Sequence, residues 1–186
     1  MKRLLDLVLA IVLVCLWALP MLIIAAIIRL TSRGPALHWS KRVGRNNDMF
    51  YMPKFRSMYV GTAAVATHLL GDANRHITPF GRFLRKTSLD ELPQLWSVLR
   101  GDMSFVGPRP ALFNQYDLVA LRTEHGVHHL RPGITGWAQI NGRDELSIEE
   151  KVEFDRQYGL RQSLSFDLYV FALTVWKVVT RAGVSH

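Results

Sequence analysis

The sequence predicts an α+β protein that is mostly helical and is held at a membrane by a helix near its N-terminus. Three observations predict this class. The stretch from Leu7 to Ile28 is apolar and carries no charge. Two β-prone segments flank a turn-rich sequence soon after it, which predicts a small β-hairpin. Apolar residues then recur at helical spacing through much of the remaining chain, and 186 residues suffice for one domain with its own core.

The apolar stretch has the length of a membrane helix. At about 1.5 Å per residue it extends roughly 33 Å, which is enough to cross the hydrocarbon core of a bilayer. It is too long for a secretory signal peptide, and no small-residue cleavage site follows it. A buried core helix of this uninterrupted length would be unusual, so a membrane location is favoured.

Two placements of this helix stay open on the residues alone. Lys2 and Arg3 precede the helix, and a larger set of basic residues follows it, so the positive-inside rule favours neither orientation clearly. Pro20 frees the carbonyl of Leu16 and bends the helix. A helix bent there could enter one leaflet and return, with both basic flanks on one side. A straight spanning helix is the equal alternative. The basic residues after the helix are Arg29, Arg33, Lys41, Arg42 and Arg45.

The positive charge is concentrated in the first part of the chain. The net charge is +8, and residues 1–110 hold 15 Lys and Arg against 6 Asp and Glu, whereas the remainder holds 8 against 9. We therefore expect the first part to meet an anionic partner, such as phosphates, lipid headgroups or nucleic acid. The single cysteine, Cys15, excludes an internal disulfide.

Shorter elements are predicted after the membrane helix. Ala36 to Ser40 and Met49 to Phe55 flank Gly44 to Asp48, which predicts the β-hairpin. Val60 to Ala73 is rich in Gly, Ala and Thr with almost no charge, which is typical of a mobile loop. Helices are predicted at Leu92 to Leu99, Ala111 to His125, Ser147 to Tyr158 and Phe166 to Val179.

Two of these helices carry a further prediction. The helix at 147–158 is acidic, and its carboxylates are expected to form a solvated face: Glu149, Glu150, Glu153 and Asp155. The helix at 166–179 is strongly apolar, with Tyr169 and Trp176 among its residues. It is short for a span and its aromatics suit the headgroup level, so an interfacial helix competes with a core helix.

The segment from Thr87 to Pro110 indicates chemistry. Two adjacent carboxylates, Asp90 and Glu91, lie among basic residues. Arginine binds phosphate through its planar fork of donors, and Mg²⁺ takes one or two carboxylates together with phosphate oxygens. This combination favours phosphoryl transfer at a metal-assisted site. The basic residues are Arg75, Arg82, Arg85 and Lys86 before the pair, and Arg100 and Arg109 after it.

A purely structural explanation of the two acids is also open. Ser88 and Glu91 have the spacing of a capping box at the start of a helix. Pro93 conflicts with a helix that begins at Ser88, because it lacks a backbone donor. A start nearer Pro93 would instead leave the acids in the turn that leads into the helix. In both cases the acids lie near a helix N-terminus, which itself favours anions.

Arginines also lie in two rigid loops. Gly107-Pro108-Arg109-Pro110 fixes two φ angles around Arg109, which serves either to present the guanidinium or only to stiffen a turn. Arg131 opens a second tight loop that ends at Trp137. His125, His128 and His129 lack a Cys or acid at ligand spacing, so zinc is disfavoured. The chain contains no P-loop and no GxGxxG motif.

Taken together, these segments resemble the monotopic phosphoglycosyl transferases, bacterial enzymes that begin glycan assembly on polyprenyl phosphate. The resemblance extends over essentially the whole chain, in order, and such long motifs rarely coincide by chance. The segments that carry it are Lys54–Met58, Ile77–Arg85, Ser88–Leu95, Gly101–Pro110 and Arg131–Gln139.

The resemblance implies a reaction and a set of site residues. Family members transfer a sugar 1-phosphate from a UDP-sugar to undecaprenyl phosphate, release UMP and require Mg²⁺. Asp90 would be the nucleophile that forms a phosphosugar–enzyme intermediate, and Glu91 would assist at the metal or in proton handling, so that both acids are metal ligands. Four basic residues would bind phosphates: Lys54, Arg85, Arg109 and Arg131.

The resemblance also implies a location. The membrane helix would be re-entrant, with residues 1–33 as the helix and its exit. Residues 34–186 would form a catalytic domain, with interfacial helices, on the cytoplasmic face of the bacterial inner membrane. The family commonly has Ser-Pro at the helix break, whereas this chain has Leu19-Pro20, so the bend depends on Pro20 without a neighbouring hydroxyl. Larger relatives carry further domains, and this chain looks like a minimal version.

The resemblance implies the surroundings of the reaction as well. The product would start an O-antigen, capsule, exopolysaccharide or glycoprotein glycan. Membrane lipids and downstream glycosyltransferases would be partners of the protein, and nucleic acid would not be a partner. The alternative is a non-enzymatic, membrane-anchored basic module that binds anionic lipid or nucleic acid. That alternative explains the charge but gives no reason for Asp90 and Glu91 among arginines. No residue pattern identifies the sugar of the donor.

Overall fold

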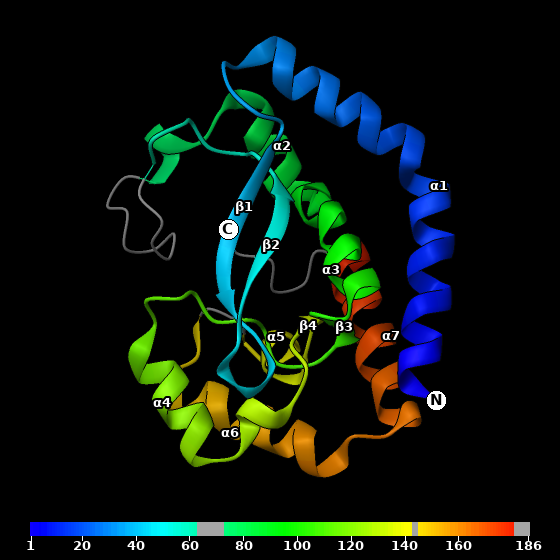
Figure 1. The fold of residues 1–186 in the computed structure, drawn as a ribbon, viewed down its shortest axis with the longest axis vertical. Helices are drawn as coiled ribbons and strands as arrows, with labels where there is room; N and C mark the ends of the chain where they lie inside the picture. The colour runs from blue at the N-terminus through cyan, green and yellow to red at the C-terminus, as the bar shows by residue number, and fades with distance from the viewer. Residues whose placement is uncertain (63–72, 143–144, 181–186) are drawn as a thin grey trace.

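The computed structural model describes residues 1–62, 73–142 and 145–180. In Figure 1 the long helix α1 (Lys2–Thr31) runs along one side of the molecule. The hairpin of β1 (Leu37–Val43) and β2 (Met49–Phe55) crosses the middle, and helices cover it from behind and at one end. The predicted class, mostly helical with a small hairpin, is confirmed. Residues 63–72 of the predicted mobile loop lie outside the described part of the chain.

Helix α1 is the one helix among the described residues that is long and apolar enough to cross a membrane. Its most apolar 18-residue window has a mean hydropathy of 3.0, and 11% of that window is buried. Figure 1 shows that α1 is bent near its middle, and Pro20 is the proline inside it. Apolar side chains there are exposed, including Leu16, Leu19 and Leu22. The predicted apolar helix and its bend are confirmed.

Both ends of α1 contact the rest of the protein. Near the N-terminus, Ala10 is fully buried in the central core, and Lys2 pairs with Asp167 of α7 (Leu164–Thr180). Near the other end, Ile24 and Ile28 are buried against Phe55 of β2 and its neighbours. Helix α1 therefore arches over the domain, with its middle exposed.

The hairpin places a polar row beside the core. β1 and β2 pair antiparallel from Leu37↔Phe55 to Val43↔Met49, so the predicted hairpin is confirmed with a longer first strand. Because side chains alternate between the two faces of a strand, Phe50, Met52 and Lys54 share one face. Their cross-strand partners on that face are Arg42, Ser40 and His38. The turn between the strands is the 3₁₀ helix η1 (Arg45–Asn47).

Short helical elements follow the hairpin in the described part of the chain. After η3 (Ala73–His76), α2 (Pro79–Thr87) is capped by Thr78, whose hydroxyl accepts from Gly81 N at 2.9 Å. It ends at Ser88 in the left-handed region, with φ 55°. The 3₁₀ helix η4 (Leu89–Gln94) then leads into α3 (Leu95–Arg100), which ends at Gly101 with φ 97°. The predicted helix at 92–99 is correct in place, but its first three residues belong to the 3₁₀ turn because Pro93 interrupts α-helical bonding.

The rest of the chain forms a second small sheet and further helices. β3 (Ser104–Val106) and β4 (Gly133–Thr135) pair in parallel, which the sequence did not predict. The predicted helices at 111–125, 147–158 and 166–179 are present with shifted bounds. The helical elements after β3 are α4 (Tyr116–Glu124), η5 (Val127–His129), α5 (Trp137–Ile140), α6 (Ile148–Arg161) and α7 (Leu164–Thr180).

One predicted helix face is wrong in part. Glu149, Glu150 and Glu153 are exposed as expected, but Asp155 of the same helix is 1% exposed and pairs with Arg122 of α4. The acidic composition indicated solvent, whereas a partner from another helix makes burial possible for this one carboxylate. Helix α7 contributes to the core through Val170, which is fully buried, whereas Trp176 is exposed, and a place for α7 at the membrane interface stays a prediction.

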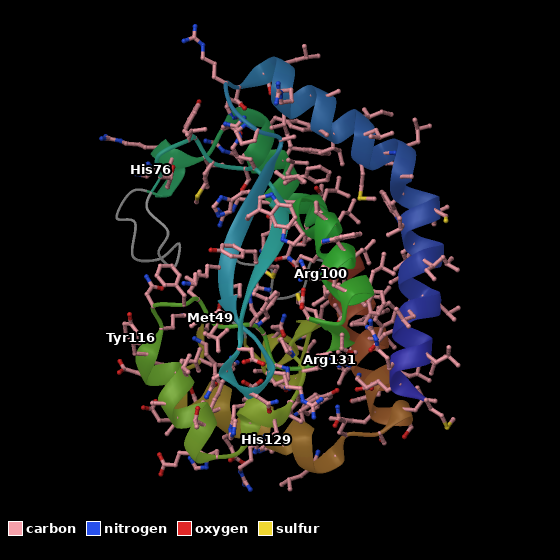
Figure 2. The ribbon with its side chains drawn as sticks, viewed as in Figure 1. Met49, His76, Arg100, Tyr116, His129 and Arg131 are labelled. Carbon is pink, nitrogen blue, oxygen red and sulfur yellow. The ribbon has the colours of Figure 1, made fainter. Side chains whose placement is uncertain are left out.

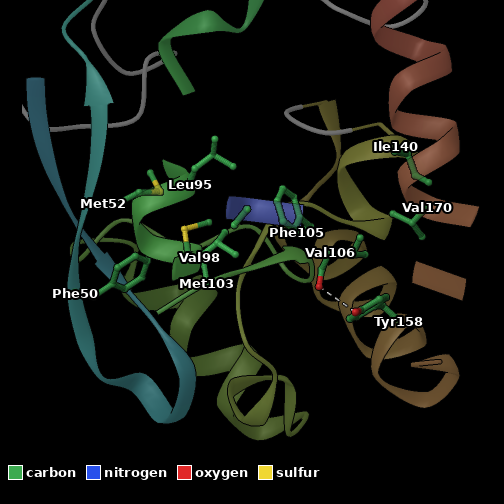
Figure 3. Packing of buried hydrophobic residues seen from close by; sticks show 11 residues of the cluster. Phe50, Met52, Leu95, Val98, Met103, Phe105, Val106, Ile140, Tyr158 and Val170 are labelled. Atoms are coloured by element: carbon green, nitrogen blue, oxygen red, sulfur yellow. Dashed lines mark hydrogen bonds between the residues drawn. The ribbon is translucent and has the colours of Figure 1, made fainter. Parts of the chain in front are cut away.

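The central core joins the elements that carry the charged residues. Phe50 and Met52 of β2 pack with Val98 of α3 and Phe105 of β3 (Figure 3). Tyr158 of α6 lies at the edge of the same cluster, where its hydroxyl donates to Val106 O at 3.0 Å (Figure 3). Since interiors are close-packed, this core fixes β2, α3 and β3 relative to one another.

Candidate active site

The two adjacent acids lie in the 3₁₀ turn η4, directly before α3. The left-handed Ser88 turns the chain between α2 and η4, and Glu91 N donates to Ser88 O at 3.2 Å. The Ser88 side chain makes no cap hydrogen bond, so the capping-box interpretation is wrong. The alternative, in which the acids occupy the turn that leads into the helix, is confirmed.

Glu91 is held by two cations. Its Oε1 accepts from Lys54 Nζ at 2.7 Å and from Arg109 Nη2 at 3.2 Å. Lys54 comes from β2, and Arg109 from the loop after β3. The side chains are mostly shielded from water, with 18% exposure for Glu91, 15% for Lys54 and 31% for Arg109. Lys54 and Arg109, predicted from two separate motifs, therefore meet at the carboxylate of Glu91, which was predicted from a third.

Asp90 differs from its neighbour. Within the described part of the chain, its carboxylate forms no hydrogen bond or ion pair and is acted on only by the surrounding charges. Burial raises the pKa of Asp90 above its usual 3.8, Lys54 opposes that shift, and Glu91 adds to it. Arg85 and Arg109, like Lys54, lower the pKa of Asp90. Asp90 thus offers its oxygens to an incoming group, close to the positive charges of Lys54, Arg85 and Arg109.

Burial and the neighbouring acids shift the pKa of Lys54 in opposite directions. Burial lowers the pKa of Lys54 below its usual 10.5, whereas Glu91 and Asp90 raise it. Arg109 adds to the lowering, because two cations lie close together at Glu91. A diphosphate placed here would relieve that repulsion, since its oxygens would face both cations.

Two further residues of this site, Arg42 and His38, were not predicted from the sequence. Arg42 shares the inward face of the hairpin with Lys54, and its pKa is lowered to about 10 by burial and by Arg109, with Glu91 opposing. His38 pairs with Lys54 across the hairpin, and burial, Arg42 and Lys54 lower its pKa. Alternation along β1 was the available signal, because residues 38, 40 and 42 must lie on one face.

The Arg109 loop is rigid and presents its guanidinium. Gly107 N donates to Thr135 O at 2.9 Å, and Gly133 N donates to Pro108 O at 2.9 Å. A Cβ on Gly107 would lie 2.3 Å from Arg131 O, which is too close for any other residue. Of the two interpretations of this loop, presentation of Arg109 is the one its contact with Glu91 supports.

Arg131 has a different set of charged neighbours. It is labelled in Figure 2, near the turn of the hairpin. The charges that act on it belong to Arg3, Arg45, Asp6 and Asp102, and burial comes first among the causes that lower its pKa. The structure therefore groups Lys54, Arg85 and Arg109 with the acids, but gives Arg131 other neighbours.

Asp90 and Glu91 fit a magnesium ion better than a transition metal. The described residues contain no group of three or more His, Cys, Asp and Glu that could hold a metal, and this applies to His125, His128 and His129 as well. Mg²⁺ needs fewer protein ligands, because it takes one or two carboxylates and keeps waters and substrate phosphates. The unengaged oxygens of Asp90 suit that requirement.

Comparison with known proteins identifies the family. The family model described as bacterial sugar transferase matches residues 1–181. The chain belongs to this family. Membership makes it a phosphoglycosyl transferase, the enzyme class that the sequence predicted. The non-enzymatic alternative is therefore wrong.

Individual relatives agree with the family. The uncharacterized sugar transferase EpsL of Bacillus subtilis (strain 168) is 43% identical over 188 residues, which cover 100% of this chain and 91% of that protein. Two UDP-glucose:undecaprenyl-phosphate glucose-1-phosphate transferases are also similar. The one from Xanthomonas campestris pv. campestris is 41% identical over 96% of this chain and 38% of its own length. The one from Escherichia coli (strain K12) is 39% identical over 95% of this chain and 40% of its own length. The chain spans less than half of the length of these two relatives.

Proposed function

We propose that this chain transfers a sugar 1-phosphate from a UDP-sugar to undecaprenyl phosphate, releasing UMP and forming undecaprenyl-diphosphate-sugar. The observation that carries the proposal is Asp90, a shielded carboxylate without a partner among the described residues, beside Lys54, Arg85 and Arg109. The names of the relatives support the substrate classes, because they include transferases of glucose 1-phosphate to undecaprenyl phosphate.

The first half-reaction would be an attack by Asp90. A carboxylate oxygen forms a bond to the sugar-bearing phosphorus, and the bond from that phosphorus to the bridging oxygen breaks, so that UMP leaves with the electron pair. Lys54, Arg85 and Arg109 face the phosphate oxygens and offset their charge, which lowers the repulsion between two anions. A covalent intermediate of this kind lets UMP depart before the lipid arrives.

The second half-reaction would release the sugar phosphate to the lipid. An oxygen of undecaprenyl phosphate attacks the same phosphorus, the bond to Asp90 breaks, and the carboxylate is restored. Both attacking groups are anions, so neither step requires removal of a proton. Glu91 is therefore assigned to holding cations, consistent with its contacts to Lys54 and Arg109. Mg²⁺ held by Asp90 and Glu91 would neutralise charge on the diphosphate as UMP departs.

The membrane helix would be re-entrant, with the catalytic domain on the cytoplasmic face of the inner membrane. The support is that both ends of α1 contact the same domain. Lys2 Nζ donates to Val106 O at 3.2 Å, and Arg56 Nη2 donates to Ser32 O at 3.0 Å at the other end. A straight spanning helix would separate its ends by about 30 Å of hydrocarbon. The exposed apolar middle of α1, bent at Pro20, is then the part that enters the lipid.

A UDP-sugar panel tests the reaction. Purified protein in detergent or nanodiscs is incubated with Mg²⁺, undecaprenyl phosphate and each UDP-sugar in turn, and UMP release is measured. We expect UMP from at least one donor, dependent on the lipid for repeated turnover, and none from Asp90→Asn. Failure of the wild-type protein to release UMP from any donor would contradict the proposal.

A further inference from the structure

The loop that presents Arg109 is held from outside through its carbonyl groups. Pro108 and Pro110 lack backbone N–H groups, so the loop can make few backbone hydrogen bonds of its own. Three consecutive carbonyls instead accept from three distant parts of the chain. Pro108 O accepts from Gly133 N at 2.9 Å, Arg109 O from Arg122 Nη1 at 2.8 Å, and Pro110 O from Arg42 Nη1 at 3.1 Å.

The donor to Arg109 O is itself fixed by a buried carboxylate. Arg122 of α4 donates through Nε at 3.0 Å and through Nη2 at 2.6 Å to the same oxygen, Oδ2, of Asp155 in α6. The Arg122 side chain is 12% exposed and that of Asp155 is 1% exposed. Charge-assisted bonds through two donors fix the plane of the guanidinium. The third donor, Nη1, is then directed at one backbone atom of the residue that contacts Glu91.

We propose that Arg122 and Asp155 are positioning residues for the transfer reaction: Asp155 orients Arg122, and Arg122 holds the Arg109 backbone where its guanidinium meets Glu91 and the donor diphosphate. The inference rests on the proposed function, because it assigns phosphate binding to Arg109. Neither residue contacts the reacting groups. The chain of contacts runs from α6 through Asp155, Arg122 and Arg109 to Glu91.

A role in stability alone does not account for this arrangement. A buried ion pair is weak evidence for stability, since apolar residues of similar volume often serve as well. Here the guanidinium has a third contact that an apolar pair or a lysine would lack, because lysine is a point charge without the planar fork. Arg122→Lys therefore keeps the charge opposite Asp155 and removes the geometry that fixes Arg109 O. A displacement of about 1 Å at a reacting group can cost about 100-fold in rate.

The test compares Arg122→Lys and Asp155→Asn in two backgrounds, wild type and Arg109→Gln. Arg156→Lys is the matched control, because Arg156 forms an exposed ion pair with Glu153 on the same helix as Asp155. The readouts are kcat and KM for the UDP-sugar, the melting temperature, and calorimetric binding of UDP without lipid. UDP binding does not depend on turnover, so it tests the positioning role separately from the proposed reaction.

We expect Arg122→Lys to lower kcat/KM for the UDP-sugar by about 10- to 100-fold and to weaken UDP binding in the wild-type background. In the Arg109→Gln background it should change both by less than about 2-fold, because coupled residues are not additive. Its effect on melting temperature should be the same in both backgrounds. Asp155→Asn should follow the same pattern, and Arg156→Lys should change nothing. Equal losses of UDP binding in both backgrounds, or no loss in either, would overturn the positioning role.

Discussion

Replacing Glu91 with glutamine separates the roles of the two adjacent acids. The amide side chain would keep the shape and one acceptor oxygen but would lose the charge that holds Lys54 at 2.7 Å and Arg109 at 3.2 Å. A hydrogen bond between charged groups is worth about 1 kcal/mol more than one to a neutral acceptor, so the two bonds together lose about 2 kcal/mol. That loss corresponds to about 30-fold in kcat/KM if it is felt fully in the transition state.

The assay follows both half-reactions. UMP release at varied UDP-sugar gives kcat/KM, and radiolabelled UDP-sugar without lipid gives the rate at which label becomes attached to the protein. We expect Glu91→Gln to lose about 30-fold or more in kcat/KM while still acquiring label slowly. Glu153→Gln, an exposed acid on α6, is the control and should match wild type. If Glu91→Gln acquired no label whereas Asp90→Asn did, the assignment of the nucleophile would be reversed and the reasoning refuted.

Three further predictions test the membrane placement, the metal and the loop. With Cys15→Ser and single cysteines placed before Lys2 and at Lys41, both sites should be labelled from the cytoplasmic side; labelling from opposite sides would establish a spanning helix. In metal-free protein, NMR of the Asp90 carboxyl should show a pKa above 3.8, because burial disfavours the charged form. Addition of Mg²⁺ should lower that pKa. A pKa at or below 3.8 without metal would contradict the site. Gly107→Ala should lower the melting temperature by several degrees, because its Cβ would lie 2.3 Å from Arg131 O, whereas Gly159→Ala meets only the end of the Leu130 side chain at 3.2 Å and should change it little.

Local signals predicted the elements that depend on neighbours in sequence. The apolar run and Pro20 predicted the bent helix α1, and the turn residues before Met49 predicted the hairpin. Pro93 raised the alternative that the two acids precede the α-helix, and the structure decides for it over the capping box. These features follow from backbone chemistry within a few residues, so no knowledge of the fold was needed.

Features that depend on distant partners were not predictable in the same way. Asp155 looked like part of a solvated face, and only the position of Arg122, 33 residues earlier, makes its burial possible. The parallel pair of β3 and β4 has three residues in each strand, too few for a periodic signal. Arg42 resembled one more flanking charge until the hairpin register placed it on the same face as Lys54, where Arg109 and Glu91 act on its charge. Long-range packing decided each of these cases.

The most direct test of the account is the site of the covalent intermediate. Wild-type protein is mixed with radiolabelled UDP-sugar and Mg²⁺ without lipid, quenched, digested and mapped. The account predicts label on the peptide that contains Asp90, release of one UMP for each labelled protein, and loss of the label when undecaprenyl phosphate is added. Absence of label on that peptide, together with kinetics that require both substrates to be bound at once, would contradict the account and indicate direct transfer.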